Sequence, residues 1–159
     1  MELNLRRPLA FIDIETTGTN VSSDRIVEIS ILKIHPNRKE EWISLRINPE
    51  MPIPQSSTSI HGITDADVAD APVFREVAKK LSAFLEGCDL AGFNAIKFDI
   101  PLLAEEFLRV NADFSFAKRK YVDVQVIFHK KEQRTLAAAY RFYCGRELQN
   151  AHSSKADTQ

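Results

Sequence analysis

The stretch Leu9-Ala10-Phe11-Ile12-Asp13-Ile14-Glu15-Thr16-Thr17-Gly18 joins an apolar run to a pair of carboxylates. We expect Leu9–Ile14 to form a buried strand. Side chains two apart in a strand point to the same face, so Asp13 and Glu15 would stand side by side at its end. Two such charges repel each other, and burying them is costly unless a cation offsets them. The stretch therefore predicts a divalent-metal site at the end of a central strand. The alternative is that both carboxylates are solvated in a turn closed by Gly18.

The composition indicates one globular domain with an ordinary core. The chain has 159 residues, of which 44% are hydrophobic and 27% charged, and its net charge is −1. This charge argues against a protein that coats nucleic acid non-specifically, but not against an enzyme that grips a few nucleotides through metal ions. Cys88 and Cys144 form no disulfide framework, which favours a reducing cytoplasm. The apolar stretch near the N-terminus is too short for a signal peptide or a membrane span, so we expect no membrane association.

The first half of the chain predicts an antiparallel meander. A second strand is expected at 24–34, and a third at 41–47, where apolar and polar residues alternate. A polar turn at 35–39 separates the two. The segment 48–59, rich in proline and serine, is expected to be a long loop closed by 61–64. Thr64 or Asp65 is placed to cap a short helix.

The second half alternates helices and strands. Pro72 opens a predicted helix that Gly87 ends, and a strand is expected at 89–93. A helix with Pro101 in its first turn, a strand at 121–124 and a helix at 135–143 follow. The apolar faces of the first two helices are formed by Val73, Val77, Leu81 and Phe84 and by Ile100, Leu103, Phe107 and Val110. The pattern predicts an α/β domain with ligands beyond the carboxyl ends of its strands.

Further polar residues stand at the ends of predicted elements, far along the chain from the first carboxylate pair. Asp99 opens the helix after the fourth strand, where capping the helix N-terminus is the alternative role. His152 and Asp157 stand at an expected helix start, where a polar tail is the alternative. Together with Asp13 and Glu15, the two aspartates supply hard oxygen ligands, which favour Mg²⁺ or Mn²⁺ over structural zinc.

These motifs resemble those of the DEDDh-type 3′–5′ exonuclease family, of the bacterial DNA polymerase III epsilon-subunit type. The resemblance spans residues 8–159. Its segments are Asp13–Gly18, His61–Thr64, Asn94 with Phe98–Pro101, and His152 with Asp157. It implies a ribonuclease H-like fold, with a mixed five-stranded sheet whose first three strands are antiparallel, and a single exonuclease domain over residues 1–159.

The resemblance also implies catalysis by two divalent cations, Mg²⁺ or Mn²⁺. Asp13 would bridge both cations, Glu15 and Asp157 would complete the first site, and Asp99 would serve the second. His152 would take a proton from the attacking water, because the ordinary pKa of histidine, about 6.5, suits a base at neutral pH. The alternative for it is an exposed, idle histidine. The implied product is a nucleoside 5′-monophosphate, released from the 3′ end of single-stranded DNA in proofreading or DNA repair.

The terminal nucleotide is expected to contact Ile14, Thr16, Thr17, Gly18, His61, Asn94 and Phe98. The two threonines would offer backbone amides and hydroxyls, and the glycine would allow close backbone approach. The histidine and the phenylalanine would stack on the base, which any base tolerates.

Simpler roles are open for several of these residues and their neighbours. Phe98 equally suits the core, whereas bracing its own loop is the less favoured alternative for His61. We expect Glu28 to be structural, and Arg25 and Lys97 to be solvated rather than bound to phosphate.

Two other functions share the motifs. An exoribonuclease of the oligoribonuclease or ribonuclease T type has the same five catalytic residues, although the 61–64 segment and the Thr16–Gly18 turn favour DNA. A catalytically idle binding subunit is the other, and the presence of all four carboxylates argues against it. A DNA polymerase III catalytic subunit is a candidate partner. The sequence ends two residues after Asp157, so most of the family's last helix is absent. Uncovered apolar surface would then favour a homo-oligomer, unless the natural chain is longer.

Overall fold

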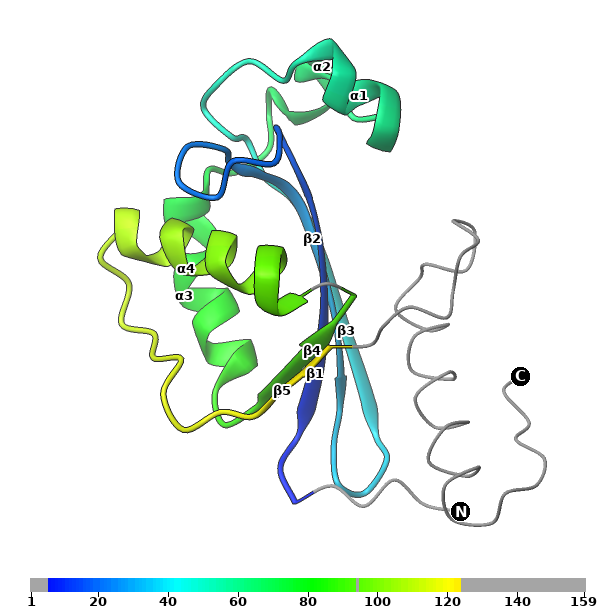
Figure 1. Ribbon diagram of the computed structural model, residues 1–159, viewed down its shortest axis with the longest axis vertical. Helices are drawn as coiled ribbons and strands as arrows, with labels where there is room; N and C mark the ends of the chain where they lie inside the picture. The colour runs from blue at the N-terminus through cyan, green and yellow to red at the C-terminus, as the bar shows by residue number, and fades with distance from the viewer. Residues whose placement is uncertain (1–5, 94, 124–159) are drawn as a thin grey trace, which may run out of the picture.

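A mixed sheet forms the centre of the molecule. The computed structural model describes residues 6–93 and 95–123, and in that part the sheet is five-stranded, with the order β3-β2-β1-β4-β5 (Figure 1). Neighbours among the first three strands are antiparallel, whereas β4 pairs parallel with both β1 and β5. The strands are β1 (Leu9–Thr16), β2 (Ile26–Ile34), β3 (Glu40–Arg46), β4 (Asp89–Gly92) and β5 (Tyr121–Asp123). The predicted meander and mixed sheet are therefore confirmed.

Helices lie against one face of the sheet and beyond one of its ends. Figure 1 shows α3 and α4 together on one face, with α1 and α2 at the top, past the end of β1. A π-helical turn, η1, runs directly into α4 and packs against β1. The helices are α1 (Gln55–His61), α2 (Asp65–Val68), α3 (Phe74–Leu85), η1 (Ala95–Asp99) and α4 (Ile100–Arg109).

Alternation along β1 divides its side chains between the two faces of the sheet. The even-numbered residues of the range 10–14 are buried in the main core with α3 and α4. Leu9 and Phe11 point the other way, into a smaller cluster with residues of β2 and β4. Asp13 and Glu15 continue this second set, so they stand together on the face opposite α3 and α4. The predicted common face of the two carboxylates follows from this register.

Two predicted boundaries were wrong at the end of the first hairpin. Strand β1 continues to Thr16, so Asp13 and Glu15 lie within the strand rather than past its end. Strand β2 begins at Ile26 rather than at Asp24, because the Asp24 carboxylate accepts hydrogen bonds within the turn between the two strands. The pairing of β1 with β2 shifts register between Glu15 and Thr16, which is where the chain leaves the regular ladder.

The segment 48–59 is not the continuous loop that was expected, because α1 begins inside it. Pro54 stands at the N-cap in an extended conformation, and Gly62 ends the helix with a φ of 78°. The amide of Gly62 donates to the carbonyl of Thr58 at 2.7 Å. The helix is short and mostly polar, so it lacks the apolar periodicity by which helices are found in sequence.

Other local predictions are confirmed. Thr64 caps α2 in a capping box, in which the amide of Asp67 donates to the Thr64 hydroxyl at 3.2 Å and the Thr64 amide donates to the Asp67 carboxylate at 2.9 Å. Gly87, with a φ of 75°, follows α3, and Pro101 stands in the first turn of α4.

Within the described residues, no helix is both long and apolar enough to cross a membrane. The predicted helix at 135–143 and the single-domain extent of 1–159 reach outside the described residues.

Candidate active site

Asp13 and Glu15 stand on the face of the sheet opposite α3 and α4, where they follow the apolar Leu9 and Phe11 along β1. In β2 their register partners are Ser30 and Glu28. Both carboxylates are half-buried. The Ser30 hydroxyl lies 2.9 Å from that of Ser44 in β3, so the neighbouring strands offer polar groups at this level. A hard cation is suited to such a place, because it offsets two adjacent carboxylates that the strand holds on one face.

Glu28 is held by an ion pair rather than directed to a ligand. The Nε of Arg46 donates to its carboxylate at 2.8 Å across the β2–β3 pair. This contact accords with the structural role expected of Glu28.

Asp99 ends η1 and is 7% exposed. Its backbone is helical, with φ −61° and ψ −47°, and its side chain makes no capping hydrogen bond. The helix-capping alternative is therefore excluded. The π-helical turn that carries Asp99 packs against β1, the strand of Asp13 and Glu15. π-helical turns are frequent at functional sites, since they redirect one side chain without ending the helix.

The C-terminal part of the predicted site lies outside the described residues. This applies to His152 and Asp157, and also to Asn94, whose assigned roles all stay predictions. Within residues 6–93 and 95–123, no group of three or more histidine, cysteine, aspartate or glutamate residues is arranged to hold a metal ion. The donor chemistry of Asp13, Glu15 and Asp99 fits Mg²⁺ or Mn²⁺, and completing the site from another segment is what the sequence predicts.

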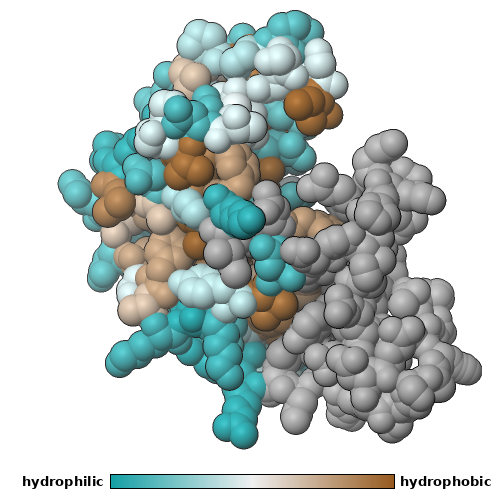
Figure 2. All heavy atoms as spheres, viewed as in Figure 1, coloured by the Kyte–Doolittle hydropathy of each residue, from teal (hydrophilic) through white to brown (hydrophobic). Residues whose placement is uncertain are grey.

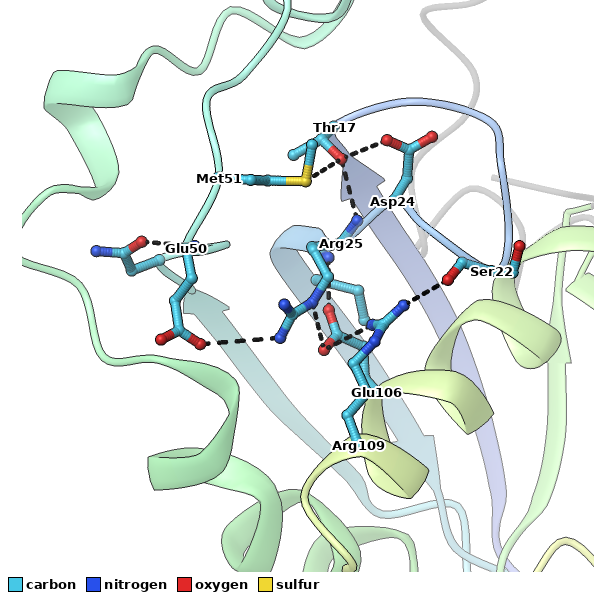
Figure 3. Close-up of polar contacts among 10 residues, drawn as sticks. Thr17, Ser22, Asp24, Arg25, Glu50, Met51, Glu106 and Arg109 are labelled. Atoms are coloured by element: carbon cyan, nitrogen blue, oxygen red, sulfur yellow. Dashed lines mark hydrogen bonds and ion pairs between the residues drawn. The ribbon is translucent and has the colours of Figure 1, made fainter.

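The turn after β1 is built from its own hydrogen bonds. The Thr17 side chain is completely buried, and its hydroxyl donates to Asp24 Oδ1 at 2.8 Å and accepts from the Arg25 amide at 3.0 Å (Figure 3). The Thr17 amide donates to the Arg25 carbonyl at 2.9 Å, and its carbonyl accepts from the Ser57 hydroxyl at 2.6 Å. The Thr16 hydroxyl donates to the carbonyl of Gly18 at 2.6 Å. These groups fix the shape of the turn, and their contact with a nucleotide stays a prediction.

Asp24 organises this turn, and it was missed because sequence analysis placed it in the second strand. Its Oδ2 accepts from the Asn20 amide at 2.8 Å, while Oδ1 accepts from Thr17. A β-carbon at Gly18 would lie 2.5 Å from Oδ2 of Asp24, which is closer than atoms can approach. Gly18 is therefore required to admit the Asp24 carboxylate. An acidic residue shortly after a Thr-Thr-Gly turn is the signal that sequence reasoning had available.

His61 braces α1 against the end of β1. Its Nδ1 accepts from the Ile63 amide at 3.1 Å, so Nε2 carries the proton and donates to the Thr16 carbonyl at 3.0 Å. The structure therefore supports the alternative role of His61, in which it braces its segment through hydrogen bonds. Stacking of His61 on a base stays a prediction. Beside it, Ile60 is 85% exposed, which is unusual for a large apolar side chain. Ile60 belongs to the segment that was expected to be a loop, where no exposed apolar helix residue would be sought.

Three other expectations concern single side chains. Phe98 is half-buried and packs against the main core, in agreement with its core alternative. The Ile14 side chain is buried on the core face of β1. Only the backbone of Ile14 is therefore available to the candidate site. Lys97 is exposed, as expected.

Arg25 is not solvated, and that expectation was wrong. Its side chain is only 18% exposed, and its Nε donates to Glu106 Oε1 at 3.1 Å. The physical reason is that Glu106, on α4, is 1% exposed, and a carboxylate so deeply buried requires a cation.

Comparison with known proteins places these features in a family. A model of the RNase_T family, described as exonuclease, matches residues 10–159. A DNA polymerase III subunit epsilon-like protein of Rhodobacter capsulatus is 39% identical over 105 residues, which is 64% of this chain and 15% of that protein. The DNA polymerase III subunit epsilon of Treponema pallidum is 33% identical over 115 residues, which is 72% of this chain and 50% of that protein. This chain thus spans half or less of the length of these two relatives.

Solved structures agree on the fold. E. coli exonuclease I, crystallised with an oligonucleotide, superposes with a TM-score of 0.67 at 18% identity, over 75% of this chain and 28% of that one. Such a likeness concerns the fold, and it confirms the ribonuclease H-like α/β architecture that was predicted.

Proposed function

This chain belongs to the exonuclease family, and on that premise we propose that it removes nucleotides from the 3′ end of single-stranded DNA with divalent cations as cofactors. The observation that carries the proposal is the pair Asp13 and Glu15, held side by side on one face of β1. Asp99 adds a third, buried carboxylate from the turn that packs against that strand.

The proposed reaction is phosphodiester hydrolysis. When bound, two divalent cations would supply positive charge that offsets the phosphodiester and eases deprotonation of the attacking water. Asp13, Glu15 and Asp99, together with Asp157, would hold the cations through carboxylate oxygens. His152 accepts the proton of the attacking water, in the neutral form that histidine adopts at physiological pH. The product is a nucleoside 5′-monophosphate.

The residues around the turn position the terminal nucleotide. We assign the backbone of Ile14 and the Thr16–Gly18 turn to its path, and Asn94 and Phe98 are the further residues proposed to contact it. His61 keeps the turn in place through the Thr16 carbonyl. Ile60, exposed beside His61, offers an apolar surface for the face of the terminal base.

Single-stranded DNA is the proposed substrate because of the relatives. One relative described above is named a DNA polymerase III subunit epsilon and the other an epsilon-like protein, and the solved exonuclease I was crystallised with an oligonucleotide. Proofreading beside a DNA polymerase III catalytic subunit, or DNA repair, is the proposed setting. Self-association of the chain stays a prediction.

A matched pair of substrates tests the proposal. The protein is incubated with DNA and RNA oligomers of one sequence, each internally labelled and carrying a free 3′ hydroxyl, with Mg²⁺, with Mn²⁺ or with a chelator. We expect nucleoside 5′-monophosphates to be released stepwise from the 3′ end of DNA, faster than from RNA, and only with metal. Faster release from RNA would make the protein an exoribonuclease. Binding without hydrolysis under every metal condition would support the idle subunit instead.

A further inference from the structure

A buried carboxylate joins two regions of the structure that are distant in sequence. Glu106 on α4 is 1% exposed, and its carboxylate is close to two arginine guanidinium groups and one backbone amide (Figure 3). Its Oε1 accepts from Arg25 Nε at 3.1 Å, and its Oε2 accepts from the Ile26 amide at 2.8 Å. Arg109 Nη1 lies 3.5 Å from the same Oε1. The chemistry proposed above does not use this cluster.

Glu106 on α4 is aligned with Asp99, which ends the η1 turn directly before that helix. The two residues are seven positions apart, which is close to two helical turns, so they lie on one side and about 10 Å apart along the axis. Asp99, Leu102, Leu103 and Glu106 are all buried, and they define the side of α4 that faces the protein. Any tilt of α4 at Glu106 therefore displaces Asp99.

At its other end, the cluster contacts the β1–β2 hairpin next to the candidate site. The Ile26 amide, which donates a hydrogen bond to Glu106, belongs to the register partner of Thr16. The pairing of β1 with β2 shifts register between Glu15 and Thr16. The amide of Arg25 donates to the Thr17 hydroxyl, within the turn that follows β1. The carboxylate thus reaches the hairpin directly opposite the end of the strand that carries Glu15.

Arg109 fixes α4 to the same turn at a second point. Its Nη2 donates to the Ser22 carbonyl at 2.9 Å, while Nη1 stays near Glu106. Arg25 is also 3.9 Å from Glu50, in the segment that follows β3. Two separate contacts from one helix to one turn restrain the angle between them, which a single contact would not do.

A charged cluster is an unusual way to fill this space. Apolar residues of similar size usually pack as well as a buried ion pair, since burying charge requires removal of water. Hydrogen bonds differ from apolar packing because they have direction, and they therefore fix orientation. This suggests that orientation, rather than stability, is what the cluster supplies.

We propose that Glu106 is a positioning residue, which orients α4 on the β1–β2 turn and so sets Asp99 relative to Asp13 and Glu15. Its effect on catalysis rests on the proposed function, whereas its effect on the turn does not. The expected signature is loss of metal affinity and turnover, with little change in substrate affinity.

The test uses Glu106→Gln in the full chain, because glutamine keeps the size and an acceptor for the Ile26 amide but removes the charge. Mn²⁺ affinity is measured by calorimetry without substrate, and kcat and KM are measured on single-stranded DNA. We expect Mn²⁺ affinity and kcat each to fall by about 10- to 100-fold, as for other residues that orient metal ligands, with KM changed far less. Val77→Ala, in the core on α3, is the control for destabilisation alone, and it should leave both quantities near wild type.

Hydrogen exchange separates this inference from the proposed function. Without metal, Glu106→Gln should speed exchange of the Thr17, Arg25 and Ile26 amides, and Val77→Ala should not do so selectively. Arg25→Gln combined with Glu106→Gln should lower the free energy of unfolding by less than the sum of the two single changes, because the two residues share one interaction. If Glu106→Gln fails to fold, Glu106→Asp replaces it, with the same pattern expected in weaker form.

Unchanged exchange at the turn in the Glu106 variant would overturn the inference, whether or not the enzyme hydrolyses DNA. Unchanged Mn²⁺ affinity and kcat in an active enzyme would also overturn it while leaving the proposed function standing. A wild-type protein that hydrolyses neither DNA nor RNA would overturn the proposed function alone, and the exchange experiment would then decide about the turn.

Discussion

Gly18 and Asp24 are packed so closely that a β-carbon at position 18 would lie 2.5 Å from the Asp24 carboxylate. The turn that follows the Asp13 and Glu15 strand depends on this contact, because Asp24 accepts hydrogen bonds from Thr17 and from the Asn20 amide. The glycine of the first motif is therefore explained within the protein itself. Its contact with a nucleotide stays a prediction.

Gly18→Ala should destabilise the protein by about 1–3 kcal/mol, because the added methyl forces the Asp24 carboxylate away from its partners. Chemical denaturation monitored by circular dichroism measures the free energy of unfolding. In an Asp24→Ala background the same substitution should cost much less, since the clashing carboxylate is gone. An equal cost in both backgrounds would show that the contact is not the reason for the glycine.

Ile60→Ser should leave stability near wild type, because the side chain is already 85% exposed. If Ile60 packs on the terminal base, KM for single-stranded DNA should rise several-fold, as expected from losing about 1 kcal/mol of contact. Leu108→Ser is the matched control, since Leu108 is 69% exposed and lies on α4, outside the residues proposed to contact the nucleotide. Equal KM values for the two variants would remove Ile60 from the substrate site.

Alkaline pH should destabilise the protein in part through Cys88. Burial raises the pKa of the Cys88 thiol above its ordinary value of 9.0, although Lys33 and Arg119 act in the opposite direction. As pH rises past 9.0, the unfolded chain loses this proton before the folded one does, so the free energy of unfolding falls. Cys88→Ala should show a shallower fall between pH 8 and pH 10, a range of about one unit on each side of an ordinary thiol. Parallel curves for the two proteins would contradict a buried, protonated thiol.

His61→Phe separates bracing from stacking. The substitution keeps an aromatic ring but removes the hydrogen bonds to the Thr16 carbonyl and from the Ile63 amide. We expect a loss of about 1–3 kcal/mol in the free energy of unfolding, because these backbone groups lose a partner in a half-buried place. Full stability with reduced activity would instead assign His61 to the substrate alone.

The sheet was predictable because its signals are local. An apolar run predicts β1 and an alternation of apolar and polar residues predicts β3. The two-residue repeat of a strand then places Asp13 and Glu15 on one face without knowledge of any neighbour. The capping box of Thr64 and the glycine after α3 are equally local. These features depend only on residues a few positions apart.

What was missed depends on contacts between distant segments. Helix α1 is short and polar, and the Ser57 hydroxyl connects it to the Thr17 carbonyl by a hydrogen bond. No periodic pattern in the sequence predicts this contact. Arg25 was expected in solvent because its partner, Glu106, comes from α4. The helix-capping alternative for Asp99 was open in the sequence, and it was decided only by the backbone of η1. His152 and Asp157, which complete the predicted site, lie outside the described residues.

The most direct measurement compares Asp13→Ala with wild type in the release of 5′-monophosphates from 3′-ended single-stranded DNA with Mg²⁺ or Mn²⁺. Thermal unfolding is recorded alongside, and Ser30→Ala, at the register partner of Asp13, is the control. We expect Asp13→Ala to abolish hydrolysis while the protein still folds, and Ser30→Ala to retain it. Hydrolysis by folded Asp13→Ala at the wild-type rate would contradict a metal-dependent site built on Asp13 and Glu15.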